Sequence, residues 1–188
     1  MTPIRLGIIG AGSFANSPHR SAMEAQPDRF EIVAAHDSSP SASLDWATRL
    51  RAAAYESLDD LLASRQIEGV FITGGPVSGR FEAARQALEA GRHVIVEPPM
   101  AASAAQCDQL IPLARRKGLT LTAAHVRRWD HAIVHARTRI EGGELGDVAL
   151  VKLAAAVGSL DDGPFGEGFD LFDAALLFNT TELVDVAA

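Results

Sequence analysis

The sequence is short of cysteine, which limits both its covalent cross-links and its redox chemistry. Its 188 residues include a single cysteine, Cys107, so no disulfide can form within the chain. Disulfide-free proteins are typical of reducing compartments. Cys107 also falls in a stretch predicted to be helical, residues 103–117, where a small packed residue is the expected role. We therefore expect neither a disulfide framework nor a cysteine nucleophile.

Cationic side chains and long apolar runs are also scarce. Lys and Arg number 17 against 24 Asp and Glu, which gives a formal net charge of −7. Nucleic acid and anionic membranes repel such a protein, and the Arg127–Arg128 pair is too small a basic patch to offset this. No apolar run approaches the length that crosses a bilayer, and Arg5 interrupts the first one, unlike a signal peptide. We expect a cytoplasmic protein with no nucleic-acid or membrane partner.

Metal-ligand and nucleophile patterns are missing too. His131 and His135 form an i,i+4 pair without a third ligand, and the other histidines have no ligand spacing with cysteines or acids. A pair on a helix surface is the expected reading, so we assign no metal site. No G-x-S-x-G pattern surrounds any serine, which argues against a serine nucleophile.

A glycine-rich turn near the start of the chain is the strongest signal that is present. Residues 4–9 predict a short apolar strand, and the G-x-G-x-x-A spacing follows it at once. Its first glycine permits a tight turn, its second lets a pyrophosphate approach the backbone, and its alanine lets the next helix pack closely. We assign this turn to cofactor binding through Gly10, Gly12, Ser13, Phe14 and Ala15.

An acidic residue stands where a dinucleotide site needs one. The apolar segment 30–36 predicts a second strand that ends on Asp37, about 22 residues beyond the glycine turn. In this position a carboxylate binds the adenosine ribose hydroxyls, although an ordinary helix cap before Ser38–Pro40 is the alternative reading. An acid repels a 2′-phosphate and no arginine follows it directly. The expected cofactor is therefore NAD, with NADP less favoured.

Strands and helices alternate through the rest of the first 124 residues. The pattern predicts strands at 70–73, 93–96 and 119–123, and helices at 14–26, 41–53, 57 onward, 77–90 and 103–117. Such alternation predicts an α/β fold, a Rossmann-type doubly wound parallel sheet, which binds ligands at the carboxyl ends of its strands. Thr73, Gly75, Pro76 and Glu97 fall at those ends, and so does His125.

Beyond residue 124 the pattern changes, which predicts a dinucleotide-binding domain at 1–124 and a truncated α+β domain at 125–188. We expect a helix at 130–141, a long strand at 147–157, a loop at 161–166, a helix at 169–178 and a last strand at 182–186. Two strands and a helix cannot hold a sheet alone in water. The first domain, another chain or a second copy must cover this piece, and we expect a homodimer through it.

Several segments together resemble the glucose–fructose oxidoreductase, inositol dehydrogenase and MocA family of NAD(P)-dependent oxidoreductases. GIIGAGSFA with His19 is similar to that family's opening, RFEIVAAHDSSP to its second strand, and ALEAGRHVIVEPPMA to its Glu-Lys-Pro segment. AAYESLDDLL, and AAHVRRW followed by GGELGDV, extend the resemblance over residues 4 to about 178. It implies hydride transfer between a nicotinamide cofactor and a small substrate such as a sugar, cyclitol or related hydroxy compound.

The departures from that family bear on catalysis. Pro98 stands where the family has a lysine, Asp170 where it has a histidine, and Arg80 where a histidine is frequent. We keep Pro98 and Arg128 among the cofactor-binding residues. His125 and Asp170 are the catalytic candidates, although His125 could merely bond a carbonyl and Asp170 needs burial to raise its pKa. The alternative is a non-catalytic dinucleotide-binding sensor or accessory subunit.

Overall fold

The computed structural model describes residues 2–15 and 17–150 of the chain, which divides into two compact units, Met1–Ala123 and Ala124–Ala188. Asp170 lies outside the described residues, as do the predicted loop at 161–166, the helix at 169–178 and the strand at 182–186.

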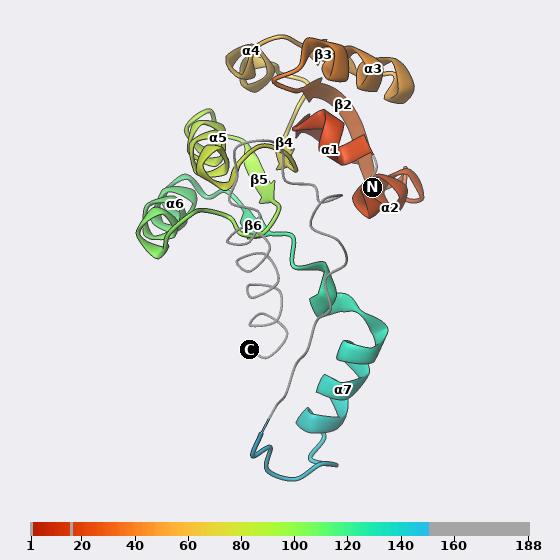
Figure 1. Ribbon diagram of the computed structural model, residues 1–188, viewed down its shortest axis with the longest axis vertical. Helices are drawn as coiled ribbons and strands as arrows, with labels where there is room; N and C mark the ends of the chain where they lie inside the picture. Colours follow the sequence, from red (N-terminus) through yellow and green to blue (C-terminus); the bar gives the residue numbers. More distant parts are fainter. Residues whose placement is uncertain (1, 16, 151–188) are drawn as a thin grey trace. The chain divides into compact units, whose positions relative to one another are not determined.

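A six-stranded parallel sheet forms the centre of the first unit (Figure 1). Its strands are β1 (Ile4–Ile9), β2 (Phe30–His36), β3 (Ala53–Tyr55), β4 (Gly69–Ile72), β5 (His93–Val96) and β6 (Leu121–Ala123). They lie in the order β3-β2-β1-β4-β5-β6, and all neighbouring pairs run parallel. The predicted doubly wound fold is confirmed, and the strand order reverses between β1 and β4.

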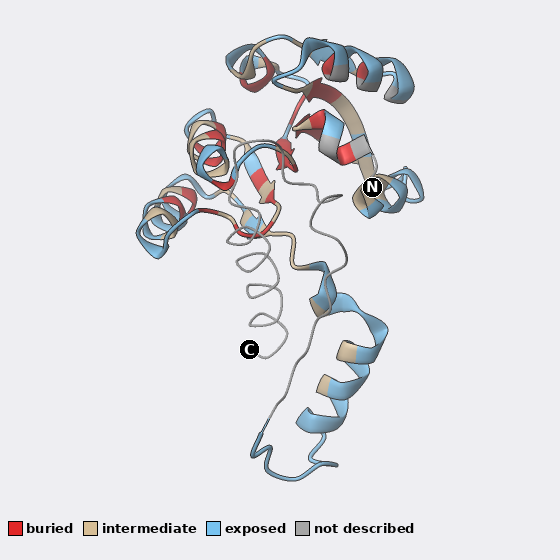
Figure 2. Cartoon of the chain, in the orientation of Figure 1, coloured by how far each residue is buried: buried red, intermediate tan, exposed pale blue. Residues whose placement is uncertain are grey.

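Helices cover both faces of this sheet. They are α1 (Ala11–Ala15), α2 (Pro18–Glu24), α3 (Pro40–Leu50), α4 (Leu58–Ala63), α5 (Val77–Glu89) and α6 (Ala104–Lys117). One face packs α4, α5 and α6 into the main apolar core, and α1, α2 and α3 lie on the other face (Figure 1). Figure 2 shows that buried residues gather in the central strands β1, β4 and β5, in part of β2, and on α4, α5 and α6.

Several helix ends follow the sequence closely. Ser57 caps α4 by accepting a hydrogen bond from the Asp60 amide, and Ser103 caps α6 in the same way through Gln106. Gly118 ends α6 in the left-handed conformation, with φ of 65°, and Gly91 follows α5 with φ of 78°. Serine oxygens satisfy the first amides of a helix, and glycine adopts positive φ without a steric penalty.

Two predicted helices were too long. The predicted helix at 14–26 is divided into α1 and α2, because Pro18 has no amide hydrogen and is accommodated at the first position of α2. The predicted helix at 41–53 ends at Leu50, and residues Ala53–Tyr55 instead form the edge strand β3 beside β2. Alanine favours helices, so this short edge strand carries no local strand signal and exists because β2 offers a free edge.

The second unit is described from residue 124 to residue 150. It contains a short 3₁₀ helix, η1 (Val126–Trp129), and α7 (His131–Glu141), which Asp130 caps through the Ala132 amide. The strand predicted at 147–157 is wrong in its described part, since residues 147–150 are exposed and irregular. A strand needs a neighbour to complete its hydrogen bonds, and none pairs with these residues in the described range. Within the described residues no helix is long and apolar enough to span a membrane.

Candidate functional site

The glycine turn is locked against the end of the neighbouring strand. Gly10 has φ of 87°, and a Cβ atom there would lie 2.3 Å from the backbone nitrogen of Gly74. Thr73 joins the same two segments, since its amide donates to the Ile9 carbonyl at 2.9 Å and its hydroxyl to the Gly10 carbonyl at 2.9 Å. Gly10 is therefore required by its φ and by the close approach of the chain after β4. The sequence motif indicated only the first of these reasons.

Asp37 bonds directly to the glycine turn. The amide of Gly12 donates to Oδ2 of Asp37 at 2.8 Å, and the amide of Ser39 donates to Oδ1 at 3.0 Å. The Asp37 amide in turn donates to Oγ of Ser43 at 2.6 Å, which anchors the residue to α3. The structure thus holds a carboxylate, with lone pairs to spare, at the carboxyl end of β2 beside the glycine turn.

Phe14, in the helix that follows the turn, turns its ring away from the sheet edge and into the core. Ser13, Phe14 and Ala15 all lie in α1, but the ring of Phe14 is fully buried. It packs edge-on against Phe71 of β4, with ring centroids 6.1 Å apart. Of the predicted cofactor contacts in α1, Phe14 therefore has only its main chain left to offer a ligand at the sheet edge.

The ends of β4 and β5 bring more predicted residues to this edge. Thr73 directly follows β4, Gly75 has φ of 78° with open space where a side chain would lie, and Pro76 caps α5. Glu97 directly follows β5, and the peptide bond between Pro98 and Pro99 is cis. A backbone that lacks a side chain next to an open edge is suited to close approach by a ligand.

Glu97 is bound by a histidine that the sequence reasoning left out of the site. Nε2 of His19, in α2, lies 2.6 Å from Oε1 of Glu97, and the two side chains are only 15% and 18% exposed. The His19 ring also packs edge-on against Phe71, with centroids 4.9 Å apart. The sequence did hold a signal for this residue. His19 lies in the first turn of the helix that follows the glycine turn, and the starts of such helices lie at the same edge of the sheet as Glu97.

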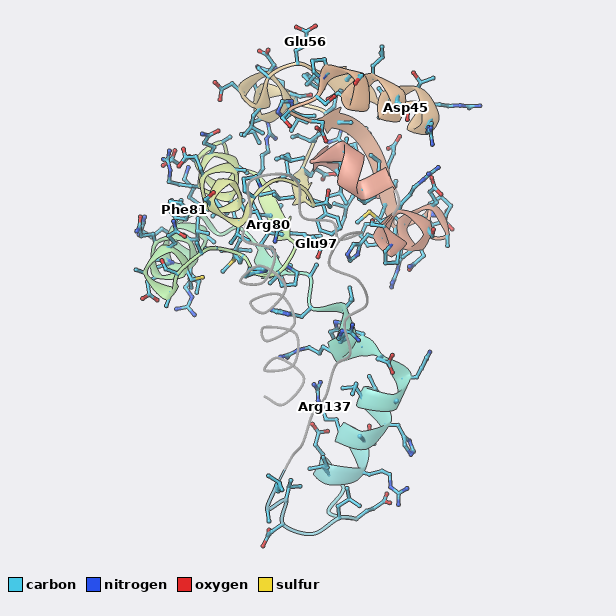
Figure 3. The ribbon with its side chains drawn as sticks, in the orientation of Figure 1. Asp45, Glu56, Arg80, Phe81, Glu97 and Arg137 are labelled. Carbon is cyan, nitrogen blue, oxygen red and sulfur yellow. The ribbon has the colours of Figure 1, made fainter. Side chains whose placement is uncertain are left out.

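Arg80, in α5, holds the segment after β5 from its other side (Figure 3). One terminal nitrogen of its guanidinium donates to three consecutive carbonyls, those of Glu97, Pro98 and Pro99, at 3.2, 3.1 and 3.3 Å. Burial lowers the pKa of Arg80, and the nearby Glu97 carboxylate opposes that shift. The group still carries its charge at neutral pH, because an arginine starts from a pKa far above it.

The guanidinium of Arg80 is held at a cost. Its Nε atom is buried and has no hydrogen-bond partner among the described residues. A buried donor left unpaired costs about 1–3 kcal/mol, so the three carbonyl bonds and the Glu97 charge must offset that loss. Buried donors of this kind are rare enough in folded proteins to suggest a specific role for the residue.

The two catalytic candidates, His125 and Asp170, and the cofactor-binding candidate Arg128 are not part of the first unit. His125 directly precedes η1 and Arg128 lies within it, so both belong to the second unit, and Asp170 lies outside the described residues. Their proposed roles stay predictions. In the part of the chain that the structure describes, no three His, Cys, Asp or Glu side chains gather in a way that could hold a metal ion.

Comparison with known proteins gives a consistent picture. Residues 4–125 match the model of a family described as an oxidoreductase family with an NAD-binding Rossmann fold. An uncharacterized oxidoreductase of Schizosaccharomyces pombe is 35% identical over 79% of this chain and 40% of its own length. A dTDP-3,4-didehydro-2,6-dideoxy-alpha-D-glucose 3-reductase of Streptomyces violaceoruber is 30% identical over 82% of this chain and 44% of its own. The chain thus spans less than half the length of both.

Solved structures show the same fold. A Thermotoga maritima oxidoreductase superposes with a TM-score of 0.71 and 29% identity, over 77% of this chain and 45% of that one. A 3-ketoreductase from Actinomadura kijaniata, solved with NADP and TDP-benzene, gives a TM-score of 0.69 and 25% identity over 76% and 43%.

Proposed function

Since the chain belongs to the oxidoreductase family with an NAD-binding Rossmann fold, we propose that it binds NAD and transfers hydride to or from a sugar, cyclitol or related hydroxy compound. The observation that carries this proposal is the fixed Asp37 carboxylate, bonded to the Gly12 amide at the carboxyl edge of the sheet. The sheet order supports it, because dinucleotides bind across the point where that order reverses.

The adenosine half of the cofactor is proposed to lie over β1 and β2. Asp37 would accept hydrogen bonds from the ribose hydroxyls, and the turn at Gly10–Gly12 would let the pyrophosphate approach the backbone. The carboxylate favours NAD over NADP, since its charge would lie against a 2′-phosphate. The Actinomadura relative was solved with NADP, so a comparison of NADH and NADPH binding is needed to decide the cofactor of this chain.

The nicotinamide half is proposed to lie over the ends of β4 and β5, against Thr73–Pro76 and Glu97–Pro99. A bound nicotinamide supplies the hydride acceptor or donor, and the protein must supply binding, orientation and a proton carrier. Pro98 has no amine to fill that last role, so we propose His125 or Asp170 for it. The dTDP-sugar named for the Streptomyces relative supports a sugar-like substrate class.

The first experiment is a titration of the purified chain with NAD, NADH and NADPH, followed by nicotinamide fluorescence or calorimetry. We expect NADH to bind and NADPH to bind more weakly. A panel of polyols and keto-sugars then tests turnover. Cofactor binding without turnover on the whole panel would favour the non-catalytic sensor or accessory subunit, and no binding of any dinucleotide would refute the proposal.

A further inference from the structure

Two ionisable side chains from two helices, His19 and Arg80, converge on the segment after β5, residues Glu97–Pro99. His19 of α2 bonds the Glu97 carboxylate from one side of the sheet edge, at 2.6 Å. Arg80 of α5 bonds the Glu97–Pro99 carbonyls from the other side, and its charge also acts on Glu97. The two helices lie on opposite faces of the sheet (Figure 1). The segment is therefore held between them.

The Glu97–Pro99 segment also lies at the part of the sheet edge where the nicotinamide half of a dinucleotide would bind. Asp37 marks the adenosine side, since it follows β2 on one side of the reversal between β1 and β4. Glu97–Pro99 follows β5 on the opposite side of that reversal. If a dinucleotide binds across the reversal, its nicotinamide half lies over β4 and β5.

On this basis we propose that Arg80 and His19 are positioning residues, which hold Glu97–Pro99 in the shape that receives the nicotinamide half of the cofactor. The inference rests on the proposed function. It gives a role to a guanidinium whose Nε is buried without a partner among the described residues, because the same group fixes three carbonyls. It also explains a His–Glu bond that is almost closed to solvent.

The Glu97–Pro99 segment needs a hydrogen-bond donor from another element. Pro98 and Pro99 have carbonyls but no amide hydrogens, so these two residues can only accept hydrogen bonds along the backbone. The three carbonyl bonds all come from one terminal nitrogen of Arg80, and a lysine ammonium also presents one nitrogen with several hydrogens. Lysine at position 80 should therefore keep the charge beside Glu97 and part of the carbonyl bonding, because its side chain is shorter than that of arginine.

The test compares NADH with ADP, which carries the adenosine and pyrophosphate but no nicotinamide. In Arg80→Met we expect the dissociation constant of NADH to rise about tenfold, the equivalent of one lost buried hydrogen-bonding anchor, while that of ADP stays within about twofold. Arg80→Lys should fall between the wild type and Arg80→Met. His19→Gln should raise the NADH constant in the same selective way, by a smaller factor.

Arg85→Met is the matched control, because Arg85 lies on the same helix and, within the described residues, its ion pairs are with Glu82 and Glu89 at the surface. It should leave the binding of both ligands unchanged. Equal losses for NADH and ADP in Arg80→Lys and His19→Gln, or no loss in either, would overturn the inference. If the wild type binds neither ligand, the proposed function itself fails.

Discussion

At the scale of single residues, the site is defined by contacts that few other side chains could make. The Asp37 carboxylate accepts hydrogen bonds from the amides of Gly12, in the glycine turn, and Ser39, in its own loop. Position 10 has room only for glycine, because a Cβ atom there would collide with Gly74. Each of these contacts makes a separate prediction, one about cofactor choice and one about stability.

Asp37→Asn tests the carboxylate. The amide oxygen of asparagine can still accept a hydrogen bond from Gly12, whereas its NH2 group cannot accept from the Ser39 amide, so the variant loses the negative charge and one of the two amide bonds. We expect the NADH dissociation constant to rise about tenfold and the preference for NADH over NADPH to shrink by a similar factor. Asp45→Asn is the control, since Asp45 pairs with Arg49 at the surface of α3. An unchanged NADH-to-NADPH ratio in Asp37→Asn would contradict the proposed role.

Gly10→Ala tests the close approach of the turn to Gly74. Both the positive φ and the 2.3 Å clash with the Gly74 nitrogen oppose a methyl group there. We expect the free energy of unfolding to fall by about 2–5 kcal/mol, measured by urea denaturation.

Gly91→Ala separates these two causes. Gly91 has a similar φ of 78° but open space at its Cβ position, so only the conformational strain remains. We expect a loss of about 1–2 kcal/mol. Equal losses in the two variants would mean that the Gly74 contact contributes nothing to stability.

At the scale of elements, some helices and strands begin where local sequence signals place them, and others form only because a neighbouring strand is present. Helices α4 and α6 begin where serine caps predict, whereas β3 exists only because β2 presents an unpaired edge. Helix α2 begins at Pro18 because a proline is tolerated in the first turn of a helix. The partner of its His19, in contrast, is Glu97, which the sheet brings close by placing it at the end of β5.

Ser57→Ala tests the cap of α4. The Ser57 hydroxyl accepts from the Asp60 amide at 3.1 Å and donates to the Asp60 carboxylate at 2.7 Å. Its loss should lower the free energy of unfolding by about 0.5–2 kcal/mol in urea denaturation. Ser39→Ala is the matched control, because Ser39 precedes α3 without making a side-chain cap bond. A larger loss in Ser39→Ala than in Ser57→Ala would refute this account of the cap.

At the scale of the whole molecule, the first unit and the described part of the second, residues 124–150, differ in how much apolar surface they bury. The first unit has a continuous core on its sheet, whereas no residue of α7 is buried and both Val134 and Ile140 remain 40% exposed. Exposed apolar side chains on a helix are suited to a partner surface. This agrees with the expectation of a homodimer, which we keep as a proposal.

Sedimentation equilibrium at micromolar concentration tests the dimer. We expect the wild-type chain to sediment as a dimer and the double variant Val134→Asp with Ile140→Asp to sediment as a monomer, because aspartate disfavours burial of these two positions. His135→Asp should remain dimeric, since helical spacing places position 135 at least about 100° around α7 from both Val134 and Ile140. A monomeric wild type would refute the homodimer.

Much of the fold could be predicted because its signals are local. The G-x-G-x-x-A spacing, the apolar strands and the serine and glycine helix ends each act within a few residues, and together they predict the parallel sheet and place Gly10, Asp37 and Glu97 at one edge. The short edge strand β3 and the division at Pro18 were missed, since the first depends on pairing and the second on where the chain turns.

What the sequence by itself determined is the class of fold and the edge at which a cofactor would bind, because periodicity and turn chemistry are properties of neighbouring residues. Only the tertiary structure decided which side chains meet there. Gly10 approaches Gly74, 64 positions along the chain, and His19 bonds to Glu97, 78 positions along. Arg80 bonds to the Glu97 carbonyl, 17 positions along. No local pattern encodes such pairs, since they arise from the order in which the strands pack.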